Sequence, residues 1–486
     1  MAAFCRAFCT NLRSRREADS PYSWFVCFCA FFIIAWTLGT ALNFGILFPV
    51  LMDYFYETRE RTGKRKPLYM CSAENPQVKH AWVGSLGLAF IFSLGPLTGS
   101  LVDRFGCRIT AFLGGISCVS GLLLSSLATS IAILYVTYSV LFGFGSSCMF
   151  VSCYVVTSLY FNKRQSIATG IIASGSGIGV LAVAPILQVL LDNFHWRKTY
   201  RITAGIFSVV CFLCLTFDPT VVKTGREERE GEEENIESEN LQEKNDVKKK
   251  RWFVDCSVFK NKRFVVLTLT STTGFCFGRG TTSASFQGAG SLCSLKLAFN
   301  IDVRFSEGLN VSADAASRLF IYIGVTTFIG RLLSGLLCNM RRVNPVYVYM
   351  GGLILDGCDI IFLTQAKTYG HLVAFSFLFG LADGVLVGAF YIQILMSVGP
   401  SLKASAMGLS ALCYGTTIAT GPALAGFMTD RLHSYIPSLI FSAVTIFAAA
   451  ALLPILVCDR KSTQPETLHC IDSEEHFNRA ERETGL

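Results

Sequence analysis

Five ionisable side chains lie deep inside long apolar runs of this sequence. They are Arg279, Arg331, Asp356, Asp359 and Asp383. An ionised side chain at the centre of a bilayer costs about 2.5–3.5 kcal/mol on insertion scales. Five such residues facing lipid would cost on the order of 12–17 kcal/mol, which is comparable to the whole folding stability of a protein. We therefore expect these residues to face protein, water or one another.

Arg331 is the first candidate for binding an organic anion, because a guanidinium stays charged when desolvated and holds a carboxylate with two parallel hydrogen bonds. The alternative is a purely structural ion pair. Arg331 and Asp383 are each about 12–14 residues into predicted helices of the same direction, so at ~1.5 Å per residue they reach similar depth. We predict that they pair when the site is empty and that an incoming carboxylate competes with Asp383. If the displaced Asp383 takes up a proton, anion binding becomes proton-linked.

The other candidates carry less specific chemistry. Arg279 would widen an anion-attracting region. Asn43 and Tyr391 could line a cavity, although polar residues between membrane helices often only bridge those helices. Asp356 and Asp359 share a helix face at i, i+3 and favour structural hydrogen bonding or protonated acids.

The elements that hold these residues are apolar runs. The 486 residues are 52% hydrophobic and only 16% charged, with a mean hydropathy of +0.48, whereas a soluble domain carries about 25% charged residues. About 20 helical residues cross a hydrocarbon core. We therefore predict an all-α membrane protein with about twelve transmembrane helices, at 22–50, 81–102, 108–129, 131–159, 166–191, 199–217, 264–284, 317–339, 345–366, 371–398, 404–428 and 436–457.

A charged stretch divides the chain into two halves of about six runs each. The predicted divisions are an N-terminal arm (1–21), a first half (22–217), a linker (218–263), a second half (264–457) and a tail (458–486). The basic residues of the arm and linker predict that both termini are cytoplasmic, although the first outer loop is also basic. We therefore interpret the net charge of +8 as a signal that orients the helices in the membrane, and we expect no nucleic-acid partner.

Short sequences recur between the two halves. Gly99-x-x-x-Asp103-Arg104 returns loosely as Gly335-x-x-x-Asn339-x-Arg341. Such internal repeats place the site of a transporter between its halves, near the membrane midplane. The glycines at 170, 175, 177 and 179 superficially look like a nucleotide loop, but they stand inside an apolar run with no preceding strand, so close helix packing is the better interpretation.

Two motifs resemble known families. Gly99-Ser-Leu-Val-Asp103-Arg104-Phe-Gly106-Cys-Arg108 resembles the loop signature of the major facilitator superfamily, for which we expect gating or folding roles. The segment Tyr160-Phe161-Asn-Lys163-Arg164, continuing to Gly179, resembles the fifth-span signature of the monocarboxylate transporter family, solute carrier family 16. The first-span signature of that family survives in part as Asp19-Ser-Pro-Tyr22-Ser-Trp24. The resemblance implies a major facilitator fold with two pseudo-symmetric halves.

Departures from the family pattern bear on mechanism. Proton-coupled lactate-type members carry a Lys where this chain has Val50, and an Asp where it has Thr327. Gly380-Leu-Ala-Asp383-Gly384 resembles the branch that moves aromatic amino acids and iodothyronines, in which the Arg corresponding to Arg331 is thought to face this Asp. The resemblance therefore puts the lactate-type proton relay in doubt and leaves a larger substrate open.

Several peripheral features complete the predictions. Cys71 and Cys293 fall in the first outer loops of the two halves, where pseudo-symmetry predicts a disulfide between them. The sequon at Asn310 falls outside and is a glycosylation candidate. The C-terminal Leu486 has a form that PDZ domains bind. Some members of the family use a single-span chaperone, which is an open partner here. We see no catalytic or metal-ligating spacing and expect no cofactor.

The main hypothesis is therefore a plasma-membrane secondary transporter of monocarboxylate-type organic acids, which works by rocking of two halves in the bilayer. A facilitator of aromatic amino acids or iodothyronines is the alternative within the same class. A non-transporting receptor or accessory subunit is the alternative of another class, and an enzyme is the least favoured reading.

Overall fold

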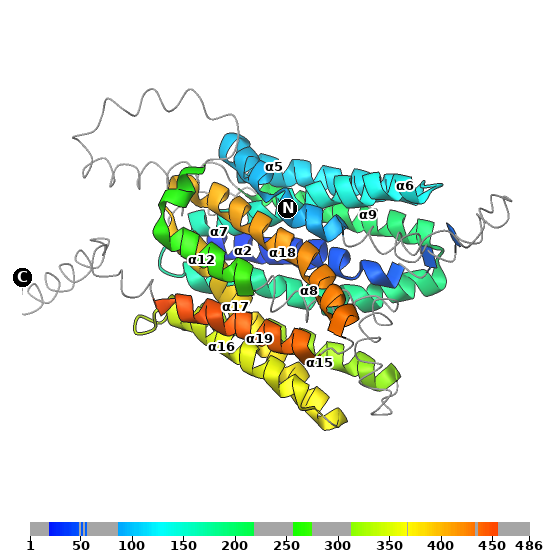
Figure 1. Ribbon diagram of the computed structural model, residues 1–486. Helices are drawn as coiled ribbons and strands as arrows, with labels where there is room; N and C mark the ends of the chain where they lie inside the picture. Colours follow the sequence, from blue (N-terminus) through cyan, green and yellow to red (C-terminus); the bar gives the residue numbers. More distant parts are fainter. Residues whose placement is uncertain are drawn as a thin grey trace, which may run out of the picture.

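The computed structural model describes residues 19–47, 50–51, 54–55, 86–217, 256–274, 313–366, 368–432 and 436–454. Over these residues the chain is helical and contains no strand. Eight of the described helices are long and apolar enough to cross a membrane. Figure 1 shows them as a bundle of roughly aligned rods, with α5, α6 and α9 on one side and α15, α16 and α19 on the other.

The helix boundaries follow the predicted runs closely. The helices are α2 (Pro21–Leu42), α5 (Gly95–Ser126), α6 (Ile131–Leu134), η1 (Tyr135–Phe142), α7 (Gly143–Tyr160), α8 (Gln165–Asn193), α9 (Trp196–Leu213), η2 (Cys214–Thr216), η3 (Cys256–Lys260), α12 (Lys262–Thr273), α15 (Ala313–Asn339), α16 (Pro345–Thr364), α17 (Tyr369–Ser397), η6 (Pro400–Leu402), α18 (Lys403–Leu432) and α19 (Ile436–Leu452). Each predicted run coincides at least in part with one of them. The count of twelve spans stays a prediction, because several runs extend beyond the described residues.

Polar caps set several of these helix starts. The side chains of Ser20, Asn261, Asn344 and Thr368 each accept a hydrogen bond from a backbone N–H group of the first turn that follows. Such caps satisfy donors that have no partner within the helix. Proline follows directly at the first helical position of α2 and α16, where its missing N–H group costs nothing. The residues next to each of these helix starts therefore determine where the helix begins.

The helix α5 contains two of the predicted spans, joined by a sharp turn. Gly106 interrupts it with φ 81° and ψ 163°, a conformation that residues with a side chain avoid. A Cβ atom at Gly106 would meet nothing within 4 Å, so the backbone conformation alone requires glycine there. The turn explains why a glycine stands between Asp103 and Arg108 in the predicted loop motif.

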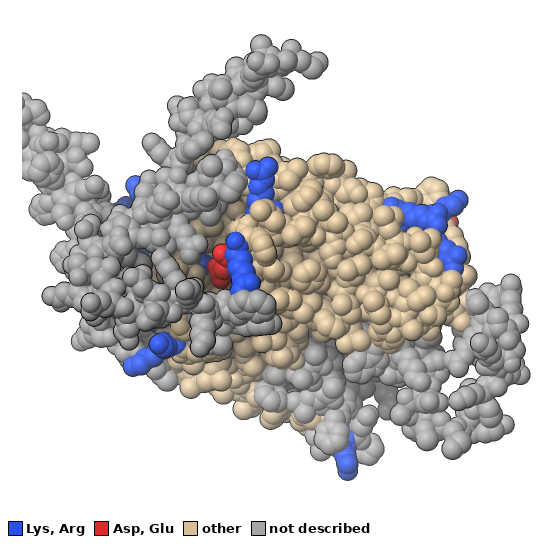
Figure 2. All heavy atoms as spheres, turned by 90° about the horizontal axis from the view of Figure 1, so that it is seen from above, with Lys and Arg blue, Asp and Glu red and all other residues tan. Residues whose placement is uncertain are grey.

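The outer surface of the bundle is apolar, as a lipid-facing surface should be. Large hydrophobic side chains such as Phe28, Leu113, Val209 and Ile321 are about half exposed or more. On the face shown in Figure 2, most Lys and Arg side chains lie toward the two ends of the molecule, with a broad band of other residues between them. This arrangement fits helices that run from one membrane surface to the other.

The two halves touch through small residues. A Cβ atom at Gly99 of α5 would lie 2.6 Å from the Ala404 carbonyl oxygen of α18, and one at Gly170 of α8 would lie 2.8 Å from the Gly335 Cα of α15. Gly99 and Gly335 are the two glycines of the predicted internal repeat. Both therefore stand at equivalent contacts between the halves, toward the side of the bundle from which residues 217 and 256 lead into the central linker, here called the linker side.

Candidate anion-binding site

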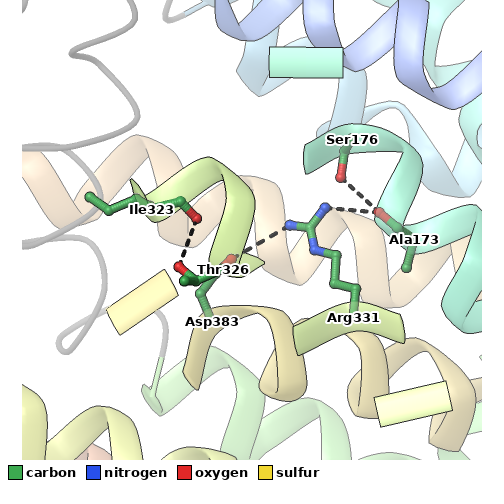
Figure 3. Close-up of polar contacts among 6 residues, drawn as sticks. All are labelled: Ala173, Ser176, Ile323, Thr326, Arg331 and Asp383. Carbon is green, nitrogen blue, oxygen red and sulfur yellow. Dashed lines mark hydrogen bonds and ion pairs between the residues drawn. The ribbon is translucent and has the colours of Figure 1, made fainter. Parts of the chain in front are cut away.

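Arg331 lies between the two halves with its guanidinium group buried. It extends from α15, and the residue is 9% exposed. Its Nη1 atom donates a hydrogen bond of 2.9 Å to the Ala173 carbonyl oxygen of α8. Its Nη2 atom lies 3.6 Å from the Asp383 Oδ2 atom of α17. Figure 3 shows the guanidinium reaching from α15 to both neighbours. One cation thus joins a carboxylate of its own half to a backbone dipole of the other half.

Glycines next to the two charged residues bring their helices together. A Cβ atom at Gly384 would lie 2.8 Å from the Gly330 Cα atom and would overlap the Thr327 carbonyl oxygen. Gly330 precedes Arg331 and Gly384 follows Asp383 in the sequence. The near-contact of α15 and α17 backbones therefore occurs at the same level as the ion pair. Small residues at membrane helix interfaces permit such close approach.

The ion pair is suited to exchange of its carboxylate. At 3.6 Å it is longer than a charge-assisted hydrogen bond of about 2.7–2.9 Å. Both partners are more than nine-tenths buried, and a buried charge is costly unless it is paired. An organic carboxylate that reaches Arg331 can therefore replace Asp383 without leaving the guanidinium uncompensated. The Ala173 carbonyl has no charge and does not compete.

Tyr391 lies in an aromatic cluster that crosses from one half to the other. The cluster, here called the aromatic bridge, consists of Phe92, Phe150, Tyr154, Tyr391 and Tyr414. Ring centroids are 4.9 Å apart for Phe92 and Tyr414, 5.8 Å for Phe150 and Tyr391, and 4.7 Å for Tyr154 and Tyr391. Tyr391 follows Gly388 by three residues on α17, and a Cβ atom at Gly388 would lie 3.5 Å from the Arg331 Cα atom. The bridge and the ion pair are thus neighbouring parts of one site.

Sequence reasoning found Tyr391 but missed the rest of the bridge. Tyr154 and Tyr414 are tyrosines in the middle of apolar runs, and a buried phenol in such a run needs a polar neighbour. That signal was available in the sequence. Phe92 and Phe150 carry no comparable signal, because phenylalanine is common throughout the apolar runs of this chain.

Asn43 is placed inside one half and away from the inter-half contact. Its Nδ2 atom donates to the Gly39 carbonyl oxygen at 2.9 Å and to the Val180 carbonyl oxygen at 3.1 Å. The residue is 1% exposed. Both amide hydrogens thus serve backbone groups of α2 and α8, which is the helix-bridging geometry that the sequence left open.

The loop motif also lies at an inter-half contact. The Asp103 Oδ2 atom accepts a hydrogen bond of 3.0 Å from the Ser405 hydroxyl of α18. Two residues earlier on that helix, the Lys403 Nζ atom donates to the Ser158 carbonyl oxygen of α7 at 3.3 Å. Arg104 and Arg108 are exposed. The start of α18 therefore docks against the part of α5 just before the turn at Gly106 and against the linker-side end of α7.

Lys163 and Arg164 contribute through their backbones. Their N–H groups donate to the Asp19 carboxylate at 3.0 and 3.3 Å, while their side chains are exposed. The Asp19 N–H group in turn donates to the Tyr160 carbonyl oxygen at 3.1 Å. The partial first-span motif and the fifth-span motif thus bind each other.

Asp356 and Asp359 are buried in α16, at 0% and 2% exposure. No three His, Cys, Asp or Glu residues within the described part of the chain could hold a metal ion together.

Thr327, which stands where lactate-type members carry an Asp, is 7% exposed on α15. Five further predicted positions lie outside the described residues, namely Arg279, Cys71, Cys293, Asn310 and Leu486.

Comparison with known proteins gives consistent relatives. The family model described as Major Facilitator Superfamily matches residues 75–415. Monocarboxylate transporter 4 of Gallus gallus is 27% identical over 410 residues, covering 83% of this chain and 80% of the relative. Monocarboxylate transporter 3 of Gallus gallus is 26% identical over 443 residues, covering 86% and 75%. Monocarboxylate transporter 12 of Homo sapiens is 26% identical over 460 residues, covering 91% and 81%.

A solved structure is similar over most of the chain. The crystal structure of the human organic anion transporter MFSD10 (TETRAN) matches with a TM-score of 0.65 and 13% sequence identity. The match covers 89% of this chain and 100% of that chain. At this identity the likeness concerns the fold alone.

Proposed function

Because this chain belongs to the major facilitator superfamily, and within it to the monocarboxylate transporter family, we propose that it carries small monocarboxylate-type organic acids across the plasma membrane. It is a secondary transporter of helical major facilitator fold. The acid binds through its carboxylate at Arg331, between the two halves. The linker side is the cytoplasmic side, and both termini lie there.

The contact of Arg331 with both halves supports this proposal. The guanidinium holds Asp383 of its own half and a backbone carbonyl of the other half. A carboxylate that displaces Asp383 therefore binds at the surface where the halves meet. Binding there can change the relative stability of the two arrangements of the halves, which is what alternating access requires.

Whether Asp383 binds a proton after its displacement decides whether transport is coupled to protons. Once its guanidinium partner is taken by substrate, Asp383 is a buried carboxylate without its counter-charge. An unpaired buried carboxylate tends to bind a proton. Uptake of one proton per acid makes the transport a symport. If water reaches Asp383 and keeps it ionised, the same site works as a uniport.

A transport assay of matched variants tests the proposal. Uptake of labelled lactate, pyruvate, tryptophan and an iodothyronine is measured at two external pH values in cells with equal surface expression. The variants are Arg331→Lys, Asp383→Asn and, as a control, Arg341→Lys at an exposed position. Lys keeps the charge and loses the two-pronged hydrogen bonding, so Arg331→Lys is expected to lower uptake by roughly 10- to 100-fold. Arg341→Lys is expected to leave uptake unchanged.

Each outcome has a defined meaning. Full activity of Arg331→Lys would remove Arg331 from the anion site. Faster uptake at the lower external pH in the unsubstituted chain, lost in Asp383→Asn, would identify Asp383 as the proton acceptor. No uptake of any compound despite surface expression would favour the receptor or accessory subunit.

Transport of aromatic amino acids or iodothyronines is the second candidate. Two observations favour it: the chain has Thr327 where lactate-type members have an Asp, and Arg331 instead faces Asp383. The same panel separates the candidates, because this alternative predicts uptake of tryptophan or the iodothyronine with little dependence on external pH.

A further inference from the structure

The aromatic bridge occupies the space on the linker side of the ion pair. Tyr391 follows Asp383 by eight residues on α17, which runs toward the linker side, so it lies about 12 Å further along the helix axis. Tyr154 lies six residues before the linker-side end of α7 at Tyr160. All five rings are at most 9% exposed. The space beside Arg331 in this direction is therefore filled by rings.

The ring pairs join opposite halves of the molecule. Phe92 precedes α5, and Phe150 and Tyr154 belong to α7, all of the first half. Their partners Tyr391 of α17 and Tyr414 of α18 belong to the second half. Aromatic pairs at such distances contribute stability beyond that of their buried area. The bridge thus stabilises the arrangement in which the halves meet on the linker side.

Simple core packing does not explain the residue types. Three of the five rings are tyrosines, and a phenol hydroxyl buried in an apolar interior costs free energy that a phenylalanine would avoid. Tyr391 lies about one helical turn beyond Gly388, where an added Cβ atom would lie 3.5 Å from the Arg331 Cα atom, and the Tyr154 ring packs against Tyr391. The two tyrosines therefore stand beside the part of α15 that carries Arg331, next to the place where an acid would bind.

We infer that Tyr154 and Tyr391, with the rings packed behind them, form the wall of the acid site that limits the size of the substrate. The inference rests on the proposed function, because it takes Arg331 as the group that holds the carboxylate. With the carboxylate fixed there, the body of the acid extends against the two tyrosine rings. A small acid fits with the bridge intact, whereas a bulky acid requires the rings to move.

Substitutions that widen and narrow this wall test the inference. The unsubstituted chain, Tyr391→Ala, Tyr391→Trp and Tyr154→Ala are compared for uptake of labelled pyruvate and labelled phenylpyruvate. One methylene group in an apolar pocket changes discrimination by about 10-fold or more. Each alanine variant is therefore expected to raise the ratio of phenylpyruvate to pyruvate uptake at least about 10-fold. Tyr391→Trp is expected to lower that ratio.

Two control variants show whether a change in the uptake ratio is specific to the size of the rings in the aromatic bridge. Phe212→Ala removes a ring that is 67% exposed on the outer surface and should leave the ratio unchanged. Tyr391→Phe removes only the hydroxyl group and should change pyruvate uptake more than the size ratio. Where an alanine variant fails to reach the surface, Tyr391→Leu and Tyr154→Leu replace it, with a ratio change in the same direction.

The possible failures are distinguishable. If the unsubstituted chain moves neither acid, the proposed function fails. Suppose instead that it moves pyruvate, and that the ratio of phenylpyruvate to pyruvate uptake in the alanine or leucine variants and in Tyr391→Trp equals the ratio in the control Phe212→Ala. The aromatic bridge then does not limit substrate size, and the inference is wrong.

Discussion

At the scale of single residues, Asp19 joins three segments of the first half. It has φ +63°, a left-handed conformation that aspartate tolerates better than most residues. Its N–H group donates to the Tyr160 carbonyl oxygen at the end of α7. Its carboxylate accepts from the backbone just before α8. The residue thus satisfies groups at one helix end and beside one helix start, where the chain itself offers no partner.

Removal of the Asp19 carboxylate should destabilise the first half. Asp19→Ala loses both acceptor bonds and places alanine in a left-handed conformation that aspartate tolerates better, so we expect a loss of about 1–3 kcal/mol. Asp19→Asn keeps one acceptor oxygen and should lose less. The measurement is the thermal unfolding midpoint of purified protein in detergent.

Asp192→Ala is the matched control for Asp19. Asp192 is an exposed aspartate that accepts a side-chain hydrogen bond from Gln188, so its substitution should leave the midpoint nearly unchanged. An Asp19→Ala midpoint equal to that of Asp192→Ala would show that the carboxylate does not stabilise the fold.

The sequence predicts the ion pair better than its surroundings. Arg331 and Asp383 stand out because charge is rare in apolar runs, and the helical rise alone places them at similar depth. The hydrogen bond from Arg331 to Ala173 could not be predicted, because a backbone carbonyl has no residue-type signal. The roles of Phe92 and Phe150 could not be predicted for a similar reason, because they depend on which helices face each other.

At the scale of helices, glycines set how closely the halves approach. Gly170 of α8 and Gly335 of α15 bring two backbones together at the inter-half contact. Interiors pack too densely to absorb even small added groups without rearrangement. The helix positions were readable from apolar runs and caps such as Asn344, whereas the π-helical turns of η1 (Tyr135–Phe142) carry no recognisable sequence signal.

A side chain at Gly170 should block closure on the linker side while leaving each half folded. Gly170→Leu places a branched side chain against the Gly335 backbone, where a Cβ atom alone would lie 2.8 Å from Cα. We expect uptake to fall about 10-fold or more, because the barrier to closure rises by at least about 1.4 kcal/mol. Uptake and surface biotinylation are measured together.

Gly205→Leu provides the control for Gly170→Leu. A Cβ atom at Gly205 of α9 would meet nothing within 4 Å, so the same substitution there should preserve uptake. Normal uptake by Gly170→Leu at normal surface level would show that this contact need not close during transport.

At the scale of the whole molecule, the contacts between halves on the linker side describe one arrangement of the transport cycle. Lys403 is 4% exposed, although it begins α18, where a cation is unfavourable for its own helix. Its compensation comes from the Ser158 carbonyl oxygen near the end of α7 in the other half. Ser405 and Asp103 add a second polar contact beside it. A buried cation that donates across the interface becomes exposed to water when the halves separate.

These contacts must part on the linker side if substrate is to leave there, so a covalent link across them should stop transport. Ser166 of α8 and Met396 of α17 face each other, with the Ser166 Oγ atom 3.9 Å from the Met396 Sδ atom. In the double variant Ser166→Cys/Met396→Cys, copper phenanthroline or a short bis-thiol reagent should join the two halves. Uptake is expected to fall to background and to return on reduction, because rigid-body rocking cannot proceed while the halves are tied.

A protease site inserted between residues 230 and 240 reports the link directly, since the cleaved halves stay together on a non-reducing gel only when they are crosslinked. The chain has 19 cysteines of its own, so the unsubstituted chain and both single variants receive the same treatment and should show neither the link nor the loss of uptake. Complete crosslinking with undiminished uptake would mean that the two halves do not separate at this point. The rocking mechanism, and with it the assignment of Arg331 to a site exposed alternately to the two sides of the membrane, would then be wrong.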